Sequence, residues 1–95
     1  MEEYVSPYLK LDKANRTVRL MGYELKLTRG EYSVLLAILE GGSVSKDDIF
    51  SAVSYDVQAS SSIPVHICSI NRKARVICGG EIVKNRRKFG YFIEI

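Results

Sequence analysis

The sequence predicts an α+β domain with a small antiparallel sheet, then three helices, then a C-terminal β-hairpin. Apolar and polar residues alternate over short runs before residue 28, as they do in half-buried strands. From residue 28 to 78, apolar residues recur every three or four positions, as on the buried face of a helix. Alternation returns after Gly79 and Gly80. We therefore expect one domain over 1–95, with a β-meander (1–27), a three-helix core (28–78) and a hairpin (79–95).

The N-terminal quarter has the pattern of three strands joined by tight turns. Residues 8–11, 17–20 and 23–27 alternate, and turn residues at 12–15 and at Gly22 separate them. Residues 1–5 are either frayed or a short edge strand before Pro7.

The first helix has clear signals at both ends. Thr28 and Glu31 form a capping box, and Gly41-Gly42 ends the helix. We expect its buried stripe to consist of Tyr32, Leu35, Leu36 and Leu39.

A short second helix should follow Ser45, which is a good N-cap residue. Asp47 and Asp48 lie in its first turn, where the helix dipole favours acidic side chains. Its buried face is predicted to be Ile49, Phe50 and Val53, and a polar loop follows.

The third helix is predicted over residues 63–77. Its buried face is predicted to be Ile63, Ile67, Ile70, Ala74 and Ile77, and its opposite face Ser62, His66, Ser69, Arg72, Lys73 and Val76. In the hairpin that follows, Phe89, Tyr91, Ile93 and Ile95 alternate along the last strand.

Charge is divided unevenly along the chain. Residues 1–60 carry 7 basic and 9 acidic side chains, whereas residues 61–95 carry 7 basic and 2 acidic ones. This asymmetry points to an anionic partner for the C-terminal part, and a basic surface without a partner is the alternative.

The order of elements and four short motifs resemble the OmpR/PhoB-type winged-helix family, the effector domains of bacterial response regulators in two-component systems. The likeness covers about residues 8–95. Its motifs are Leu27-Thr28 with Glu31 and Leu35-Leu36; Val44-Ser45-Lys46 with Ile49 and Val53; Val65-His66-Ile67 with Ile70 and Arg72-Lys73; and Arg87 with Gly90-Tyr91.

This resemblance implies sequence-specific binding to double-stranded DNA by a transcriptional regulator. The second and third helices would form the helix-turn-helix, the third helix would enter the major groove, and the hairpin, or wing, would touch the minor groove. RNA polymerase could contact the loop at 54–61, and two copies could bind DNA head-to-tail. Separately, the longest apolar run is too short to span a membrane and no signal-peptide pattern follows Met1, so we expect a cytoplasmic protein without a membrane partner.

Two groups of residues are the candidate DNA contacts. The wing supplies Lys84, Asn85, Arg86, Arg87 and Lys88, and the third helix supplies Ser62, His66, Ser69, Arg72 and Lys73. Ser45 and Lys46 are candidate phosphate contacts at a helix N-terminus, and plain capping is the alternative for them.

The third helix departs from the family pattern. The family usually has arginines where this chain has Cys68, Ser69 and Asn71. Asn71 could read adenine if it points outward. The departure motivates a second hypothesis, a protein–protein interaction module without DNA readout.

We expect no enzyme activity, cofactor or metal. The only histidine, His66, has no nucleophile at helical spacing. His66, Cys68 and Cys78 do not have the spacing of a zinc site, and both cysteines are expected to be free thiols.

Overall fold

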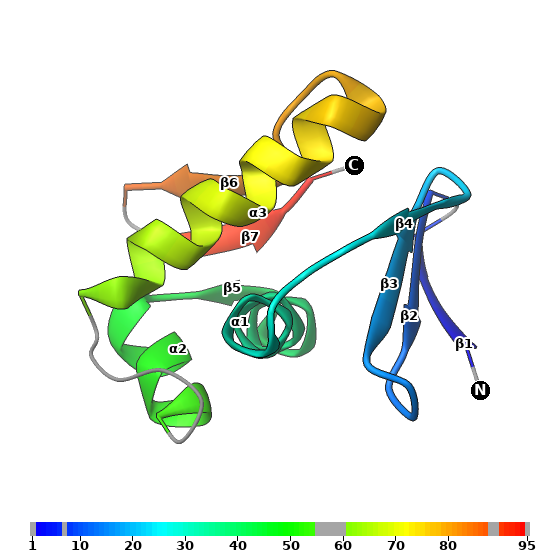
Figure 1. The fold of residues 1–95 in the computed structure, drawn as a ribbon. Helices are drawn as coiled ribbons and strands as arrows, with labels where there is room; N and C mark the ends of the chain where they lie inside the picture. The colour runs from blue at the N-terminus through cyan, green and yellow to red at the C-terminus, as the bar shows by residue number, and fades with distance from the viewer. Residues whose placement is uncertain (1, 7, 55–60, 88–89, 95) are drawn as a thin grey trace.

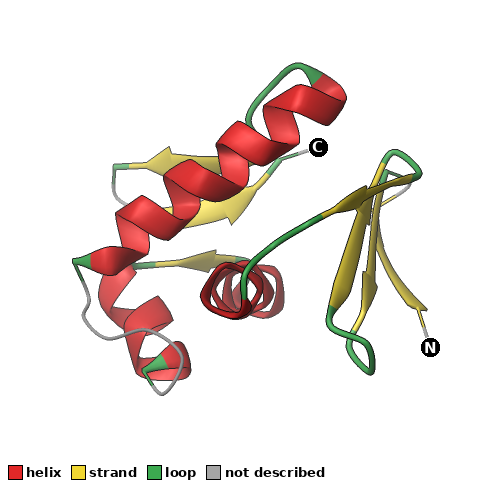
Figure 2. Cartoon of the chain, viewed as in Figure 1, coloured by secondary structure: helices red, strands yellow, loops and turns green. Residues whose placement is uncertain are grey.

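The fold places α1 between two groups of elements (Figure 1). The computed structural model describes residues 2–6, 8–54, 61–87 and 90–94. A four-stranded sheet stands on one side of α1 (Arg29–Gly41), and the other helices lie on its opposite side with a second sheet. Figure 2 shows the same division by secondary structure, with two sheets separated by helices. The α+β class expected from the sequence is therefore confirmed.

The first sheet is an antiparallel meander in the order β1-β2-β3-β4. The side chain of Asp12 accepts hydrogen bonds from the backbone N–H groups of Ala14 (3.1 Å) and Asn15 (3.3 Å), which tightens the turn between β2 and β3. The strands are β1 (Glu2–Ser6), β2 (Leu9–Asp12), β3 (Thr17–Leu20) and β4 (Tyr23–Leu25). The N-terminal segment is thus an edge strand, and the last strand ends two residues earlier than expected.

α1 begins and ends where its capping residues predict. The Thr28 hydroxyl accepts from the Glu31 N–H at 3.3 Å, and the Glu31 carboxylate accepts from the Thr28 N–H at 2.9 Å. Gly42, at φ 81°, follows the last turn.

The expected buried stripe of α1 is wrong in part. Tyr32 and Leu35 are buried, but Leu36 and Leu39 are only partly so, and Val34 and Ile38 are fully buried instead. The helix lies between the first sheet and the other helices, so its buried surface is broader than one stripe.

The two remaining helices are α2 (Lys46–Val53) and α3 (Ser62–Cys78). Ser45 caps α2 by accepting from the Asp48 N–H at 3.1 Å. Ile49 and Val53 are buried as expected, and Phe50 is partly buried. α3 ends at Cys78, and Gly79 follows it in a left-handed conformation.

The second sheet contains a strand that sequence periodicity missed. β5 (Ser43–Val44) pairs with β7 (Gly90–Ile93), which also pairs with β6 (Val83–Arg86). Two residues are too few to show a period, so β5 is defined by its partner. It attaches the wing to the segment between α1 and α2.

Both sheets and all three helices contribute to one hydrophobic core. Among the described residues, no helix is long and apolar enough to cross a membrane.

Candidate nucleic-acid interface

The outward face of α3 differs from the one expected. Val65, Cys68, Arg72 and Val76 are exposed, whereas Ser62, His66, Ser69 and Lys73 are only partly so. At 100° per residue, the buried set Ile63, Ile67, Ile70, Asn71 and Ala74 turns the exposed face toward Val65 and Arg72. Arg72 is therefore the candidate contact on α3 that projects most directly into solvent.

Asn71 lies on the buried side of α3. The sequence allowed it to read adenine if it pointed outward, but it is 5% exposed and points into the protein. Its side-chain oxygen accepts from the N–H groups of Ile82 (3.1 Å) and Val83 (2.9 Å), and its amide nitrogen donates to the Val83 carbonyl at 3.0 Å. A polar residue at the margin of an apolar stripe gives no sequence signal for burial.

Lys73 has an internal partner. Its ammonium lies 2.6 Å from the carboxylate of Glu31, which is 4% exposed on α1. Burial tends to raise the pKa of Glu31, but hydrogen bonds from Lys73, Ser69 and the Thr28 backbone outweigh it and lower the pKa to about 2. The ion pair ties α3 to α1 and partly neutralises the Lys73 charge.

The wing presents a row of exposed polar and basic side chains. Asn85, Arg86 and Arg87 are exposed, and Lys84 is partly buried. The Arg86 guanidinium lies 5.1 Å from the centre of the Phe92 ring on β7, a cation–π arrangement across the wing. Lys88 lies outside the described residues.

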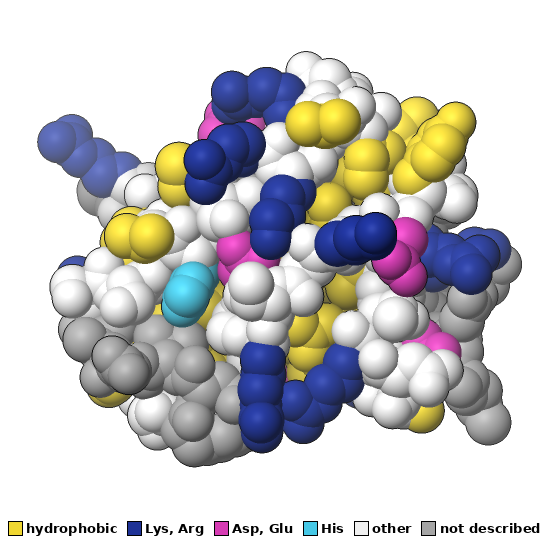
Figure 3. Space-filling model, viewed as in Figure 1, with side chains coloured by type: hydrophobic (Ala, Val, Ile, Leu, Met, Phe, Trp, Pro, Cys, Tyr) yellow, Lys and Arg dark blue, Asp and Glu magenta, His cyan; other side chains and the backbone are white. Residues whose placement is uncertain are grey.

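A groove of about 430 Å³ separates α3 from the wing. Cys68 and Asn71 line it from α3, and Lys84, Asn85 and Tyr91 line it from the wing. The two candidate contact elements are thus the two walls of one groove. Figure 3 shows Lys and Arg side chains over the face that α3 crosses and at its left edge, on the side of the wing.

The candidate phosphate contacts Ser45 and Lys46 are not among the residues that line this groove. Ser45 and Lys46 are exposed at the start of α2, where the Ser45 hydroxyl has the capping role that the sequence predicted. Arg75 is exposed and lies 3.8 Å from Glu81, so it is both a surface residue and an ion-pair partner. Cys68 and Cys78 are free thiols.

Comparisons with known proteins identify the fold. No family model and no curated protein matches the sequence. Among solved structures, the chain is similar to a streptococcal redox sensor of a family evolved from two-component response regulators, with TM-score 0.80 and 20% identity. The likeness covers 99% of this chain and 42% of that one, so the chain spans less than half of that protein's length.

Two further structures carry the same likeness. The DNA-binding domain of the response regulator AdeR, solved with an intercistronic region, has TM-score 0.78 and 15% identity over 94% of this chain and 95% of that one. The response regulator DrrB, a Thermotoga maritima OmpR/PhoB homologue, has TM-score 0.74 and 20% identity over 99% of this chain and 44% of that one. The chain therefore has the winged-helix fold of OmpR/PhoB-type response-regulator DNA-binding domains.

Proposed function

We propose that this chain binds double-stranded DNA in a sequence-specific manner and serves as a transcriptional regulator. In this proposal the outward face of α3 enters the major groove, and the wing contacts phosphates and the minor groove. A helix of this size fits the major groove, where base pairs present distinct donor and acceptor patterns.

The groove between α3 and the wing is the observation that carries the proposal. It places α3, which carries the exposed Arg72 outside the groove, beside the strand whose Lys84 and Asn85 line the groove. Arg86 and Arg87 follow these two residues in the chain and are exposed. The C-terminal part of the chain has the positive charge that a phosphate backbone requires. The AdeR domain, which shares the fold, was solved bound to DNA.

The candidate contacts differ in their exposure to solvent, and so in the role that we propose for each. Arg72, Arg86 and Arg87 are exposed and are the main contacts in the proposal. Ser62, His66 and Ser69 are only partly exposed, so they would contact DNA at the margin of the interface. Lys73 would contribute mainly by fixing α3 against Glu31.

The first test is a selection from a random pool of DNA duplexes with the purified domain at near-physiological salt. An enriched sequence is the expected result. A pool that binds without enrichment would reduce the proposal to contact with the DNA backbone, and a pool that is never retained would contradict it.

The same assay can test the wing. Arg87→Ala should weaken binding to the selected duplex several-fold, because a charge facing the phosphates is lost. Arg19→Ala is the matched control, since Arg19 is exposed on the four-stranded sheet and pairs in register with Lys10 and Glu24. Equal losses from both variants would remove Arg87 from the proposed interface.

A second candidate function, a protein-interaction module, is favoured by one observation. Val65 and Val76, both on the outward face of α3, are 65% and 86% exposed. Apolar side chains there read no hydrogen-bond pattern and could instead pack on a protein. Absence of duplex binding even at low salt would favour this function.

Two further partners stay predictions. Contact with RNA polymerase through the 54–61 loop involves residues 55–60, which lie outside the described residues. Head-to-tail pairing of two copies would appear as repeated half-sites in the selected sequences.

A further inference from the structure

We infer that Asn71 is a positioning residue, which holds the wing in a fixed place against α3 so that both contact one duplex together. The inference rests on the proposed function. Asn71 would touch no DNA, because its side chain is buried between α3 and the start of β6.

The side-chain amide of Asn71 forms hydrogen bonds, as both acceptor and donor, with the backbone at the start of β6. Its oxygen accepts from two consecutive backbone N–H groups, those of Ile82 and Val83, and its nitrogen donates to the Val83 carbonyl at 3.0 Å. The same nitrogen lies 3.5 Å from the Glu81 carboxylate. A side-chain amide has both the donors and the acceptor that this geometry needs, so few residue types could replace it.

The hydrogen bonds of Asn71 span the short glycine-containing turn that joins α3 to the wing. α3 ends at Cys78, and only Gly79, Gly80 and Glu81 separate it from the residues that Asn71 holds. Glycine restricts the backbone less than any other residue. Asn71 therefore supplies a direct tie between α3 and β6 in addition to the covalent connection through this turn.

The tie lies between the two proposed contact surfaces. Asn71 is adjacent to Arg72 in α3, and Val83, which it holds, is adjacent to Lys84 in the wing. When one surface is bound, a rigid tie presents the other to the same duplex at a high effective concentration. Without it, part of the binding free energy of the wing is spent on fixing the orientation of the wing.

The test compares the effect of Arg87→Ala in three backgrounds. In the wild-type chain this substitution should weaken duplex binding several-fold. In the Asn71→Ala background, the fold-loss of affinity caused by Arg87→Ala should be less than half of the loss in the wild-type chain. The slope of the log–log plot of binding constant against salt should also become shallower, because the wing no longer contacts the duplex fully. Val18→Ala is the control, since Val18 is 1% exposed in the four-stranded sheet and its loss lowers stability without touching the wing. In the Val18→Ala background, Arg87→Ala should weaken binding by the same factor as in the wild-type chain.

The outcomes separate this inference from others. All affinities are measured at a temperature well below the midpoint of unfolding of each variant. Suppose that Asn71→Ala is folded, that Arg87→Ala weakens its binding as much as it weakens that of the wild type, and that its salt slope is unchanged. Asn71 then contributes stability alone, and the inference is overturned. If the wild-type chain binds no duplex, the proposed function itself fails.

A second substitution keeps the test decisive if Asn71→Ala does not fold. Asn71→Asp can still accept from both N–H groups, but it cannot donate to the Val83 carbonyl when ionised, and it places a negative charge near Glu81. In the Asn71→Asp background, Arg87→Ala should weaken duplex binding by a smaller factor than it does in the wild-type chain. A factor equal to that of the wild type would again overturn the inference.

Discussion

Buried polar side chains determine how the helices and the wing are joined. Glu31 and Asn71 are the buried polar or charged residues of the described core, and each has hydrogen-bond partners on another element. Glu31 links α1 to α3 through Lys73, and Asn71 links α3 to β6. A buried polar group is costly when its partner is lost, so these two residues constrain the arrangement more than an apolar contact of equal area would.

Glu31 predicts a specific dependence of stability on pH. Its pKa is about 2 in the folded protein, against an ordinary value of 4.5, so its contribution is present above pH 4.5 and is lost as pH falls toward 2. The contribution at neutral pH is on the order of 3 kcal/mol. Urea unfolding should therefore show Glu31→Gln as markedly less stable than wild type at pH 7, with the difference shrinking near pH 2.

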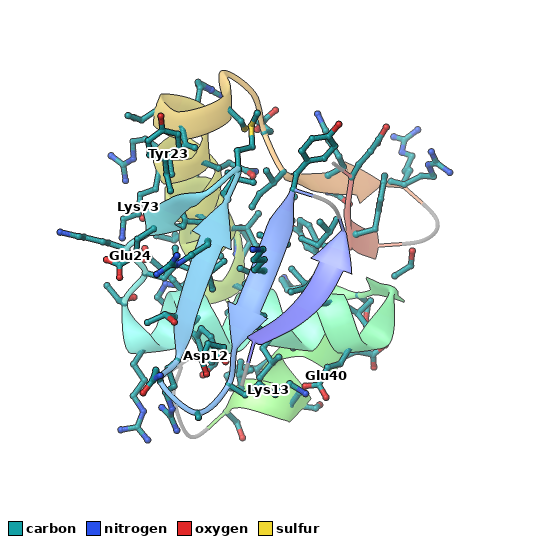
Figure 4. All side chains as sticks on the ribbon, turned by 90° about the vertical axis from the view of Figure 1, so that its right-hand side faces the viewer. Asp12, Lys13, Tyr23, Glu24, Glu40 and Lys73 are labelled. Atoms are coloured by element: carbon teal, nitrogen blue, oxygen red, sulfur yellow. The ribbon has the colours of Figure 1, made fainter. Side chains whose placement is uncertain are left out.

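Glu40→Gln is the control for this experiment, because Glu40 is exposed near the end of the same helix. In Figure 4, Glu40 lies low in the view beside Lys13, whereas Lys73 lies at its left edge beside Glu24. If the stabilities of Glu31→Gln and Glu40→Gln depend on pH in the same way, the carboxylate of Glu31 is not responsible for the pH dependence.

At the scale of elements, the short strand β5 joins the wing to the rest of the domain. Gly90, the first residue of β7, has φ 82° and lies against the backbone of Val44. A Cβ at position 90 would overlap the Val44 carbonyl. The left-handed conformation and this close approach both require glycine, so the sequence Gly90-Tyr91 has a packing reason as well as a family likeness.

Gly90→Ala should destabilise the domain by roughly 1–3 kcal/mol, since it combines backbone strain with displacement of β5 from β7. Gly80→Ala is the matched control, because a Cβ added to Gly80 would meet no atom within 4 Å and Gly80 has no positive φ. Urea unfolding measures both. A loss of stability in Gly80→Ala as large as that in Gly90→Ala would contradict the role of close packing.

For the whole molecule, the distribution of charge predicts how salt affects binding. The last 35 residues have 7 basic and 2 acidic side chains, but Lys73 is paired internally and Arg75 lies near Glu81. We expect about five phosphate contacts, and hence a slope of about −4 to −5 in a log–log plot of binding constant against salt. Filter binding or fluorescence anisotropy over a range of salt measures it. A slope near zero would contradict an electrostatic interface.

Much of this architecture could be predicted from local sequence patterns. The Thr28–Glu31 capping box, the Ser45 cap and the glycines after α1 and α3 act within a few residues, so the helix ends follow from neighbouring side chains. The apolar spacing of Ile63, Ile67 and Ile70 likewise predicted which side of α3 is buried.

The remaining features depend on contacts between segments far apart in the chain. β5 exists because Val44 meets Tyr91, and Lys73 turns inward because Glu31 lies 42 residues earlier at the start of α1. Asn71 is buried because β6 and the residue before it offer three backbone partners. Local periodicity contains no information about such partners, so the elements followed from the sequence, whereas the geometry of the candidate interface followed from their packing.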